Sequence, residues 1–262
     1  LANSNPNKPM YDLKDKNAII TGGSGGIGRS TAKLMLEYGA RVLLVDIDGD
    51  GLKEAKAELN HDRLETLVAD VSKENEVAQY AARAEELFPQ IDIFFNNAGV
   101  EGVVAPLEDY PLEVFDQVIN INIKGVYYGL RHVMPKMKEK GGSVIITSSV
   151  AGMEGTPMVL PYVTSKHAVI GMMRSAAKEG APHKIRVNSV NPSPVDNRMM
   201  RSLEEGFAPG QGAAAKENFE KLIPLGRYAT NEEVAHQVLF LASDLSAFIT
   251  GTVNPVDGGL TA

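Results

Sequence analysis

Short apolar runs bounded by turn residues alternate along the chain with longer stretches of helical period. Apolar runs of this length and setting predict buried strands, and the longer periodic stretches predict helices. We predict strands at Ala18–Thr21, Val42–Asp46, Glu65–Ala69, Ile91–Asn96, Ser143–Ser148, Arg186–Asn191 and Thr252–Val256. We predict helices near Ile27–Tyr38, Gly51–Leu59, Glu74–Phe88, Leu112–Met137, Tyr162–Glu179 and Asn231–Ala242.

This alternation predicts an α/β fold. Strands and helices that follow one another through short connections imply a parallel sheet with helices on both faces. Right-handed crossovers make such a sheet doubly wound and Rossmann-like, here with about seven strands. No linker divides the chain, so we expect one domain over residues 11–262. Residues 1–10 are polar, lack the pattern of a signal peptide and predict a flexible tail.

One segment breaks the alternation. Between Asn191 and Leu225 no strand is predicted, and the stretch is rich in Pro, Met and charge around the Gly-rich centre GFAPGQGAAA. Long segments without regular structure in compact domains are usually functional or disordered. We interpret residues 193–225 as a mobile lid over a site, with a plain surface insertion as the alternative. Met199, Met200 and Phe207 either line a substrate pocket there or pack helices.

Composition narrows the function classes. The 262 residues are 44% hydrophobic and 23% charged, which is typical of a soluble globular protein. A net charge of −7 gives no electrostatic footprint for nucleic acid, and no apolar run has the length of a membrane span. The absence of cysteine excludes disulfides and thiolate metal sites and fits a cytoplasmic location. The five scattered histidines show no metal-ligand spacing, so we expect no metal site.

A glycine-rich turn joins the first predicted strand to the first predicted helix. Residues 21–28 read TGGSGGIG, and Gly22, Gly26 and Gly28 permit a sharp turn, a close pyrophosphate and tight packing of helix on strand. The helix N-terminus adds free N–H groups and a positive dipole end. We therefore expect the turn, with Ser24 and Ile27, to bind a dinucleotide; a purely structural turn is the alternative.

The second predicted strand ends in Asp46, 18 residues after Gly28. A carboxylate at this position accepts hydrogen bonds from the adenosine ribose and repels a 2′-phosphate. Position 25, inside the turn, is Gly rather than Arg or Lys. The sequence therefore favours NAD over NADP, with a helix-capping role for Asp46 as the alternative.

Two further strand ends carry polar or small residues. Asp70 and Val71 follow the third predicted strand, and Asn97, Ala98 and Gly99 follow the fourth. Ligands of doubly wound sheets bind at the carboxyl ends of the strands, so we expect these residues to contact the adenine part of NAD. A helix cap at Asp70 and plain turn chemistry at Asn97–Gly99 are the alternatives.

A serine, a tyrosine and a lysine form the candidate catalytic set. Ser149 ends the fifth predicted strand, Tyr162 follows it by 13 residues, and Lys166 lies one helical turn beyond Tyr162. A free tyrosine has a pKa of about 10, and a neighbouring ammonium lowers the pKa by stabilising the phenolate. We predict that Tyr162 is the general acid/base and that Ser149 holds the reacting oxygen. In isolation, a chance Tyr–Lys pair on one helix face is the alternative.

Together these motifs resemble the short-chain dehydrogenase/reductase family, from about Asp12 to Leu260. The resemblance rests on TGGSGGIG, Asp46, Asp70-Val71, NNAG at 96–99, NIKG from Asn122, the serines at 148 and 149, YVTSK from Tyr162 and VDGG near the end. It implies that Ser149, Tyr162 and Lys166 are catalytic and that Asn122 joins Lys166 through a water-linked relay. It also implies that Lys166 holds the nicotinamide ribose.

After the sixth predicted strand the chain departs from the family pattern. The family usually has Pro-Gly and then a Thr, whereas NPSPVDN places Ser193 at the Gly and Asn197 at the Thr. The resemblance implies that Pro192, Val195 and Asn197 contact the nicotinamide, and Asn can still hydrogen-bond its carboxamide. The loss of the glycine is expected to constrain the backbone.

Glu101 follows the NAG loop, close to the expected substrate position. An E-G pair follows this loop in similar dehydrogenases of cyclic diols and ketones, which suggests a contact with a substrate hydroxyl. The alternative is a solvated loop carboxylate.

The sequence thus predicts an oxidoreductase that moves a hydride between NAD(H) and a secondary alcohol or its ketone, such as a cyclic alcohol, diol or sugar. Asp46 and the charge of −7 disfavour a 3-oxoacyl carrier reductase. The presence of both Tyr162 and Lys166 disfavours a non-catalytic nucleotide-sensing module. The resemblance implies a homotetramer, or a homodimer, formed through the helices near 112–137 and 162–179. The net charge and the lack of a long apolar run predict no nucleic acid or membrane partner.

Overall fold

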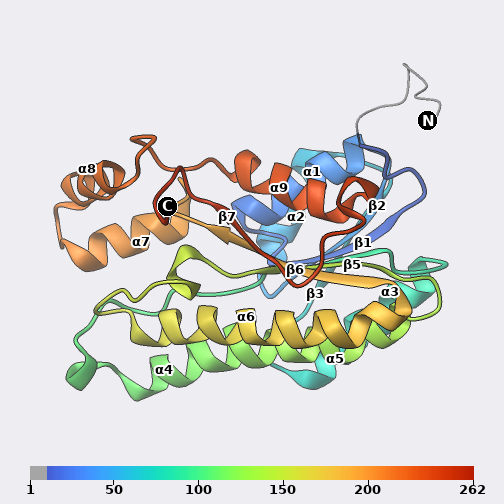
Figure 1. The fold of residues 1–262 in the computed structure, drawn as a ribbon, viewed down its shortest axis with the longest axis horizontal. Helices are drawn as coiled ribbons and strands as arrows, with labels where there is room; N and C mark the ends of the chain where they lie inside the picture. The colour runs from blue at the N-terminus through green and yellow to red at the C-terminus, as the bar shows by residue number, and fades with distance from the viewer. Residues whose placement is uncertain (1–10) are drawn as a thin grey trace.

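The computed structural model describes residues 11–262, which form one seven-stranded parallel sheet in the order β3-β2-β1-β4-β5-β6-β7 (Figure 1). All seven predicted strands are present, each within two residues of its predicted bounds, and the doubly wound fold is confirmed. The predicted tail at residues 1–10 lies outside the described residues. The strands are β1 (Asn17–Thr21), β2 (Arg41–Asp46), β3 (Leu64–Val68), β4 (Ile93–Asn96), β5 (Gly142–Thr147), β6 (Ile185–Pro192) and β7 (Val253–Val256).

Helices cover both faces of the sheet. They are α1 (Gly26–Glu37), α2 (Gly49–Leu59), α3 (Glu74–Leu87), α4 (Leu112–Val118), α5 (Gly125–Met137), α6 (Leu160–Gly180), α7 (Arg198–Phe207), α8 (Gly212–Leu222) and α9 (Asn231–Ala242). Figure 1 shows α1, α2 and α9 on one side of the sheet and α3, α5 and α6 on the other. None of the helices in residues 11–262 combines the length and apolar character that crossing a bilayer requires.

The central strands are buried from both sides. Every residue of β1 and β4 is buried, as expected for parallel strands between two helical layers. Successive side chains of a strand point to opposite faces, so Ile19 belongs to one core cluster and Ile20 to the other. The carboxyl ends of these strands are therefore set by a core that is packed on both faces.

The strand order reverses between β1 and β4, which is where doubly wound sheets bind ligands. The Thr21 hydroxyl at the end of β1 accepts the N–H groups of Asn97 and Ala98 at 2.9 and 3.0 Å. The Asn97 amide donates to the Thr21 carbonyl at 3.0 Å, and its oxygen accepts from the Thr147 hydroxyl at 2.9 Å. Side chains thus tie the ends of β1, β4 and β5 together at the crevice.

The prediction of a single helix over Leu112–Met137 is wrong in one respect, because the helix is interrupted. A π-helical turn at Ile119–Lys124 separates α4 from α5, and the N–H of Gly125 bonds to the carbonyl of Asn120, five residues earlier. Inside this turn the Asn122 side chain accepts the N–H of Val100 at 2.8 Å and donates to its carbonyl at 2.9 Å. The wider turn is held by this pairing with a neighbouring loop.

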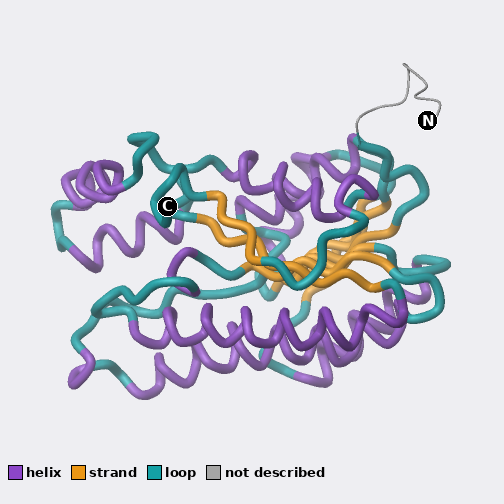
Figure 2. The backbone as a smooth tube through the Cα atoms, viewed as in Figure 1, coloured by secondary structure: helices purple, strands orange, loops and turns teal. Residues whose placement is uncertain are grey.

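The segment predicted to be a lid is mostly helical. It holds no strand, as predicted, but α7 and α8 occupy most of it and lie together at one end of the molecule (Figure 2). The expectation of a long stretch without regular structure is therefore wrong. The Asn197 side chain caps α7 by accepting the N–H of Met200 at 3.3 Å, which is a strong helix start.

Two of the apolar lid residues pack against other parts of the lid. Met200 is buried in a small cluster with Ile223 and Tyr228. The ring of Phe207 lies edge-on to that of Phe219, with centroids 5.6 Å apart. The packing alternative is therefore confirmed for Met200 and Phe207, and Met199 keeps part of its surface exposed.

Candidate active site

The glycine turn has the close contacts that its sequence predicts. Gly22 has φ = +68°, in the left-handed region that favours glycine, and a Cβ on Gly28 would lie 2.2 Å from the carbonyl oxygen of Gly22. Helix α1 begins at Gly26, within this turn, and its N-cap residue Gly25 supplies no side-chain hydrogen bond. The N–H groups of the first turn of α1 are therefore not capped by a side chain, which suits a phosphate group.

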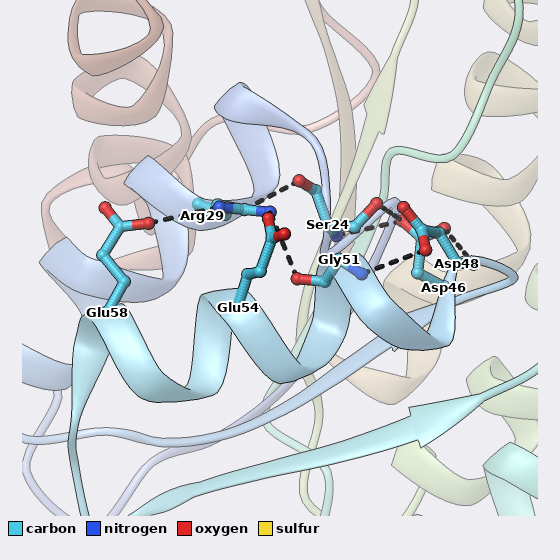
Figure 3. Close-up of polar contacts among 7 residues, drawn as sticks. All are labelled: Ser24, Arg29, Asp46, Asp48, Gly51, Glu54 and Glu58. Atoms are coloured by element: carbon cyan, nitrogen blue, oxygen red, sulfur yellow. Dashed lines mark hydrogen bonds and ion pairs between the residues drawn. The ribbon is translucent and has the colours of Figure 1, made fainter.

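Asp46 lies at the end of β2, against the glycine turn (Figure 3). Its Oδ2 accepts from the N–H and the hydroxyl of Ser24 at 3.0 and 2.8 Å, and its Oδ1 accepts the N–H of Asp48 at 3.0 Å. Asp48, rather than Asp46, caps α2 by accepting the N–H of Gly51. The helix-capping alternative for Asp46 is thus wrong. A carboxylate offers about four acceptor positions, so Asp46 retains capacity for a ribose hydroxyl.

Arg29 on α1 shares the partner Ser24 with Asp46, and the sequence did not indicate it because an arginine at this position is typical of an exposed helix face. Figure 3 shows its guanidinium between the turn and α2, donating to the carbonyls of Ser24 and Gly51 at 2.8 and 3.1 Å. It also pairs with Glu54 and Glu58 at 3.4 and 3.3 Å. Arg29 therefore fixes the start of α2 against the turn and is occupied by protein groups.

The ends of β3 and β4 also reach the crevice. Asp70 accepts the N–H of Ser72 at 2.8 Å, whereas the N-cap of α3 is Lys73, so the cap alternative for Asp70 is wrong. Val71 is buried and packs against Gly125 of α5, where an added Cβ would lie 3.0 Å from its side chain. The predicted contacts of Asp70, Val71 and Asn97–Gly99 with the adenine part of a cofactor stay predictions.

Ser149, Tyr162 and Lys166 meet at the carboxyl edge of the sheet. Ser149 follows β5, accepts the N–H of Ala151 at 3.2 Å and donates to the carbonyl of Pro192 at 3.4 Å. Tyr162 lies in the first turn of α6, and the Lys166 Nζ is 5.4 Å from the centroid of its ring. The ammonium donates to the Thr147 carbonyl at 3.0 Å, a partner that the sequence did not indicate.

Burial is the largest cause of the pKa shifts of Tyr162 and Lys166. It raises the pKa of Tyr162 to about 12, and the hydrogen bond with Ser149 opposes this rise while the charge of Glu101 adds to it. Burial also lowers the pKa of Lys166 to about 8. The predicted lowering of the Tyr162 pKa by Lys166 is therefore wrong for the protein alone. The physical reason is that the ammonium bonds to Thr147 and lies over the ring, while burial disfavours the phenolate.

Asn122 is buried next to the same set. Its amide donates to the Ser165 hydroxyl at 3.0 Å, as well as to Val100. An added Cβ on Gly99 would lie 3.2 Å from the Asn122 Oδ1 and 3.5 Å from the Lys166 Nζ, so both side chains border Gly99. The water-linked relay between Asn122 and Lys166 stays a prediction.

The departure from the family pattern after β6 causes no backbone strain. The φ angle of Ser193 does not lie in the left-handed region, and its N–H bonds to the Val256 carbonyl at 3.1 Å. Ser193 therefore replaces the glycine without strain, and the expected constraint on the backbone stays a prediction. Val195 is buried and forms an isolated bridge with Ala229, and the side chain of Asn197 is engaged as the cap of α7.

Glu101 is buried, with 6% of its surface exposed, so the alternative of a solvated loop carboxylate is wrong. Its Oε1 lies 3.3 Å from the Nη1 of Arg198, the first residue of α7. Its charge also raises the pKa of Tyr162. Over residues 11–262, no group of three or more His, Cys, Asp or Glu side chains is arranged to hold a metal ion.

Comparison with known proteins places this geometry in a family. The family model described as enoyl-(acyl carrier protein) reductase matches residues 22–261. The chain is 38% identical to levodione reductase of Leifsonia aquatica over 97% of both chains. It is 35% identical to 2,5-dichloro-2,5-cyclohexadiene-1,4-diol dehydrogenase of Sphingobium indicum, over 97% of this chain and 100% of that one. It is 36% identical to a 3-oxoacyl-[acyl-carrier-protein] reductase of Thermotoga maritima, over 95% and 98%.

Solved structures of similar proteins have the same fold. Levodione reductase superposes with a TM-score of 0.92 at 38% identity, covering 94% of this chain and 97% of that one. NAD⁺-bound xylitol dehydrogenase superposes with a TM-score of 0.89 at 30% identity, covering 94% and 99%. The protein therefore belongs to the short-chain dehydrogenase/reductase family, the family that its motifs resemble. It is an oxidoreductase of the type that acts on CH–OH groups.

Proposed function

We propose that the protein is an NAD(H)-dependent oxidoreductase that interconverts a secondary alcohol and its ketone, with Tyr162 as the general acid/base. The observation that carries this proposal is the meeting of the Tyr162 phenol, the Ser149 hydroxyl and the Lys166 ammonium at the carboxyl edge of the sheet. The N-terminus of α1, which no side chain caps, opens at the same edge. A pyrophosphate site and an acid/base pair are thus combined in one crevice.

When bound, NAD supplies the acceptor or donor of the hydride. In the oxidative direction Tyr162 takes the hydroxyl proton of the alcohol as the carbon gives up its hydride, and it returns that proton in reduction. Ser149 donates a hydrogen bond to the reacting oxygen and stabilises the charge that develops there. Lys166, whose Nζ lies 5.4 Å from the centroid of the Tyr162 ring, would hold the nicotinamide ribose beside the reacting groups.

A Tyr162→Phe variant tests the acid/base role. It keeps the ring and removes the proton that the reaction needs, so turnover should fall by about 100- to 10,000-fold. The measurement is the initial rate of NADH formation with a good alcohol substrate. Turnover that survived this substitution would show that Tyr162 is not the acid/base.

NAD rather than NADP is the proposed cofactor. Asp46 presents a carboxylate where the ribose is expected, and a 2′-phosphate placed there would be repelled. Arg29 could neutralise such a phosphate only by giving up its contacts with Ser24, Gly51 and the two glutamates. Initial rates with NAD⁺ and NADP⁺ test this choice, and equal or better rates with NADP⁺ would overturn it.

Cyclic alcohols, diols and their ketones are the proposed substrate class. The names of levodione reductase and of the cyclohexadiene-diol dehydrogenase support this class. The buried Glu101 carboxylate, whose charge reaches Tyr162, also suits a substrate with a second hydroxyl. A panel of cyclic diols, sugars, polyols and hydroxysteroids, scored by NADH absorbance, tests it.

A 3-oxoacyl carrier reductase is the second candidate, because one relative carries that name. The carrier is acidic, whereas this chain has a net charge of −7. Reduction of a short 3-oxoacyl thioester with NADPH at a rate above that of cyclic ketones with NADH would favour this candidate. A nucleotide-sensing module without chemistry is disfavoured by the intact pair of Tyr162 and Lys166.

We propose a homotetramer in solution, with a homodimer as the alternative. The outer layer of α4, α5 and α6 carries exposed apolar side chains, including Leu112 and Tyr127. Burying such side chains between subunits would remove apolar surface from water. Light scattering measures the number of subunits directly.

A further inference from the structure

Met158 has a backbone conformation that methionine rarely adopts. Its φ is +67°, in the left-handed region where a Cβ lies too close to the following carbonyl oxygen. The other non-glycine residues of 11–262 with positive φ are Asp15, Asn60 and Lys184. Asp and Asn adopt this conformation more readily because their short polar side chains can hydrogen-bond locally. Met158 is therefore the one apolar side chain on a strained backbone in the described part of the chain.

The hydrogen bonding of the loop explains the conformation of Met158 but not its side chain. The Met158 carbonyl accepts the N–H of Ala105 at 2.9 Å, which ties the loop between β5 and α6 to the loop after β4. Glycine would make the same bond without strain, because it adopts positive φ freely. The Met158 side chain belongs to none of the three core clusters and is 40% exposed. Strain that the fold does not need is concentrated at functional sites, so we look for a ligand contact.

The loop between β5 and α6 begins and ends at proposed catalytic residues. It follows Ser149 and leads into α6, whose first turn holds Tyr162; Figure 1 shows it in yellow-green at that end of α6. Near the start of the loop, a Cβ on Gly152 would lie 2.6 Å from the carbonyl oxygen of Lys166, so the loop is packed directly against the proposed catalytic helix. The exposed side chain of Met158 is therefore presented at the same edge of the sheet as the proposed catalytic set.

Three more apolar side chains of the two tied segments are exposed to a similar extent. Val103 is 40% exposed, Met153 38% and Leu160 39%. Val103 lies two residues before Ala105, and its N–H donates to the Tyr110 hydroxyl at 3.1 Å, so its backbone is fixed in this position. Exposed apolar side chains that gather on one part of a surface mark binding sites. An apolar molecule resting on them would remove their surface from water.

We propose that Met158 is a specificity-determining residue that contacts the apolar body of the substrate, and that the substrate is a cyclic alcohol or ketone with an apolar ring rather than a sugar or polyol. The inference rests on the proposed function, because it places the ring beside the oxygen that Ser149 and Tyr162 receive. Methionine suits this contact, since its flexible thioether adapts to irregular apolar shapes. A sugar would gain nothing from it, because hydroxyl groups buried against carbon and sulfur lose their hydrogen bonds to water.

Methyl NMR tests the contact without any turnover. The methionine methyl groups are labelled with carbon-13, and Met158→Leu identifies the Met158 signal. In the presence of NADH, 4-methylcyclohexanol should shift that signal saturably, and glycerol at the same concentrations should not. The signals of Met35 and Met173, which are buried in the core, should stay in place. A Met158 signal that the cyclic alcohol leaves unchanged would overturn the proposal. So would a signal that moves only with protein concentration, because a second copy of the chain would then cover Met158.

Kinetics with Met158→Gly tests the specificity. This variant removes the side chain and the strain together, so its midpoint of unfolding in urea should not fall. The ratio of kcat/KM for 4-methylcyclohexanone to that for dihydroxyacetone should fall by about 10-fold, because the ring loses an apolar contact. The loss should lie in KM, since that contact is the same in the ground state and the transition state. Met158→Leu keeps an apolar side chain of similar size and should keep most of the ratio.

Lys184→Gly is the matched control. Lys184 has φ = +57° and an exposed side chain, but it lies just before β6, at the opposite edge of the sheet. Its substitution relieves the same strain and should leave the ratio unchanged. A ratio that Met158→Gly does not lower, or a lower unfolding midpoint in Met158→Gly alone, would overturn the proposal. Absence of turnover with either ketone in the wild type would instead count against the proposed function, because the NMR titration decides the contact without it.

Discussion

The cradle and the predicted lid are built in different ways. The cradle consists of the turn Gly22–Gly28 and the strand ends that surround it, and backbone fit holds it: a Cβ at Gly28 would overlap the carbonyl of Gly22. The lid consists of residues 193–225, and polar side chains hold much of it. Arg201 and Lys216 both pair with Asp196, at 2.6 and 3.2 Å, and all three are partly exposed.

The difference indicates which region of the protein tolerates substitutions. Changes to the cradle collide with packed backbone, and interiors at close packing respond to even one added methyl group. Changes at Lys216 or Asp196 in the predicted lid break partly exposed ion pairs, which contribute little each. We therefore expect cofactor choice to depend on the cradle, and the predicted opening and substrate choice to depend on residues 193–225.

Gly28→Ala should produce the largest effect. The added Cβ meets backbone at 2.2 Å, so the free energy of unfolding should fall by about 3 kcal/mol and NAD affinity should be lost with it. The matched control is Gly25→Ala, whose Cβ would meet its nearest neighbour at 3.4 Å. Urea unfolding and NAD titration measure the two quantities. Equal losses in both variants would show that close approach is not what shapes the turn.

Lys166→Met tests whether the buried Lys166 ammonium destabilises the folded protein in a pH-dependent way. Burial lowers the pKa of Lys166 from 10.5 to about 8, so below pH 8 the folded state bears the full cost of a buried ammonium. Between pH 8 and 10.5 the unfolded chain binds more protons than the folded one, and wild-type stability should rise with pH. The variant should be more stable than the wild type at pH 7, by about 2 kcal/mol.

Urea unfolding of the wild type and Lys166→Met at pH 7 and pH 10 measures this difference. The gap should shrink as the pH rises, since deprotonation of Lys166 removes the cost. A gap of the same size at both pH values would contradict the assigned cause.

Asp46→Asn should have a smaller effect, confined to the cofactor. The amide keeps the shape and loses the charge, so the preference for NAD⁺ over NADP⁺ in kcat/KM should fall by about 10-fold. Asp48→Asn is the control two residues away, because Asp48 caps α2. Asn caps helices about as well as Asp, so this substitution should leave both stability and the cofactor preference nearly unchanged. A preference that Asp46→Asn does not alter would argue against a ribose contact.

Lys216→Gln in the lid should have the smallest effect. Lys216 pairs with Asp196 at 3.2 Å and with Glu220 at 3.8 Å, and both carboxylates keep part of their surface exposed. The free energy of unfolding should fall by no more than about 1 kcal/mol, and the loss should fade in high salt. A loss comparable to that of Gly28→Ala would erase the contrast between lid and cradle.

The strands and the glycine turn could be predicted because their causes are local. A buried strand followed by TGGSGGIG leaves few conformations open, and the pair of Tyr162 and Lys166 needs only one helical turn. Helix α7 also had a local signal: Asn197 precedes Met200, Leu203 and Phe207 at helical spacing. The glycines after Phe207 obscured that signal because they indicated a loop.

Other features depend on contacts between residues far apart in the sequence. Glu101 and Arg198 are 97 residues apart, so their pairing could not be read from spacing. The π-helical turn around Asn122 follows from the pairing with Val100, and its apolar pattern does not differ from that of an α-helix over so few residues. The direction of the Tyr162 pKa shift depends on burial, which the spacing of Tyr162 and Lys166 does not report.

The hydrogen bonds of the Thr21 hydroxyl have a consequence for product release. Through Asn97 it joins the ends of three adjacent strands, so the floor of the crevice has no hinge of its own. We expect the product to leave by movement on the opposite side, at α7 and α8. Substitutions in α7 and α8 should then change the rate of product release without changing the affinity for the nucleotide.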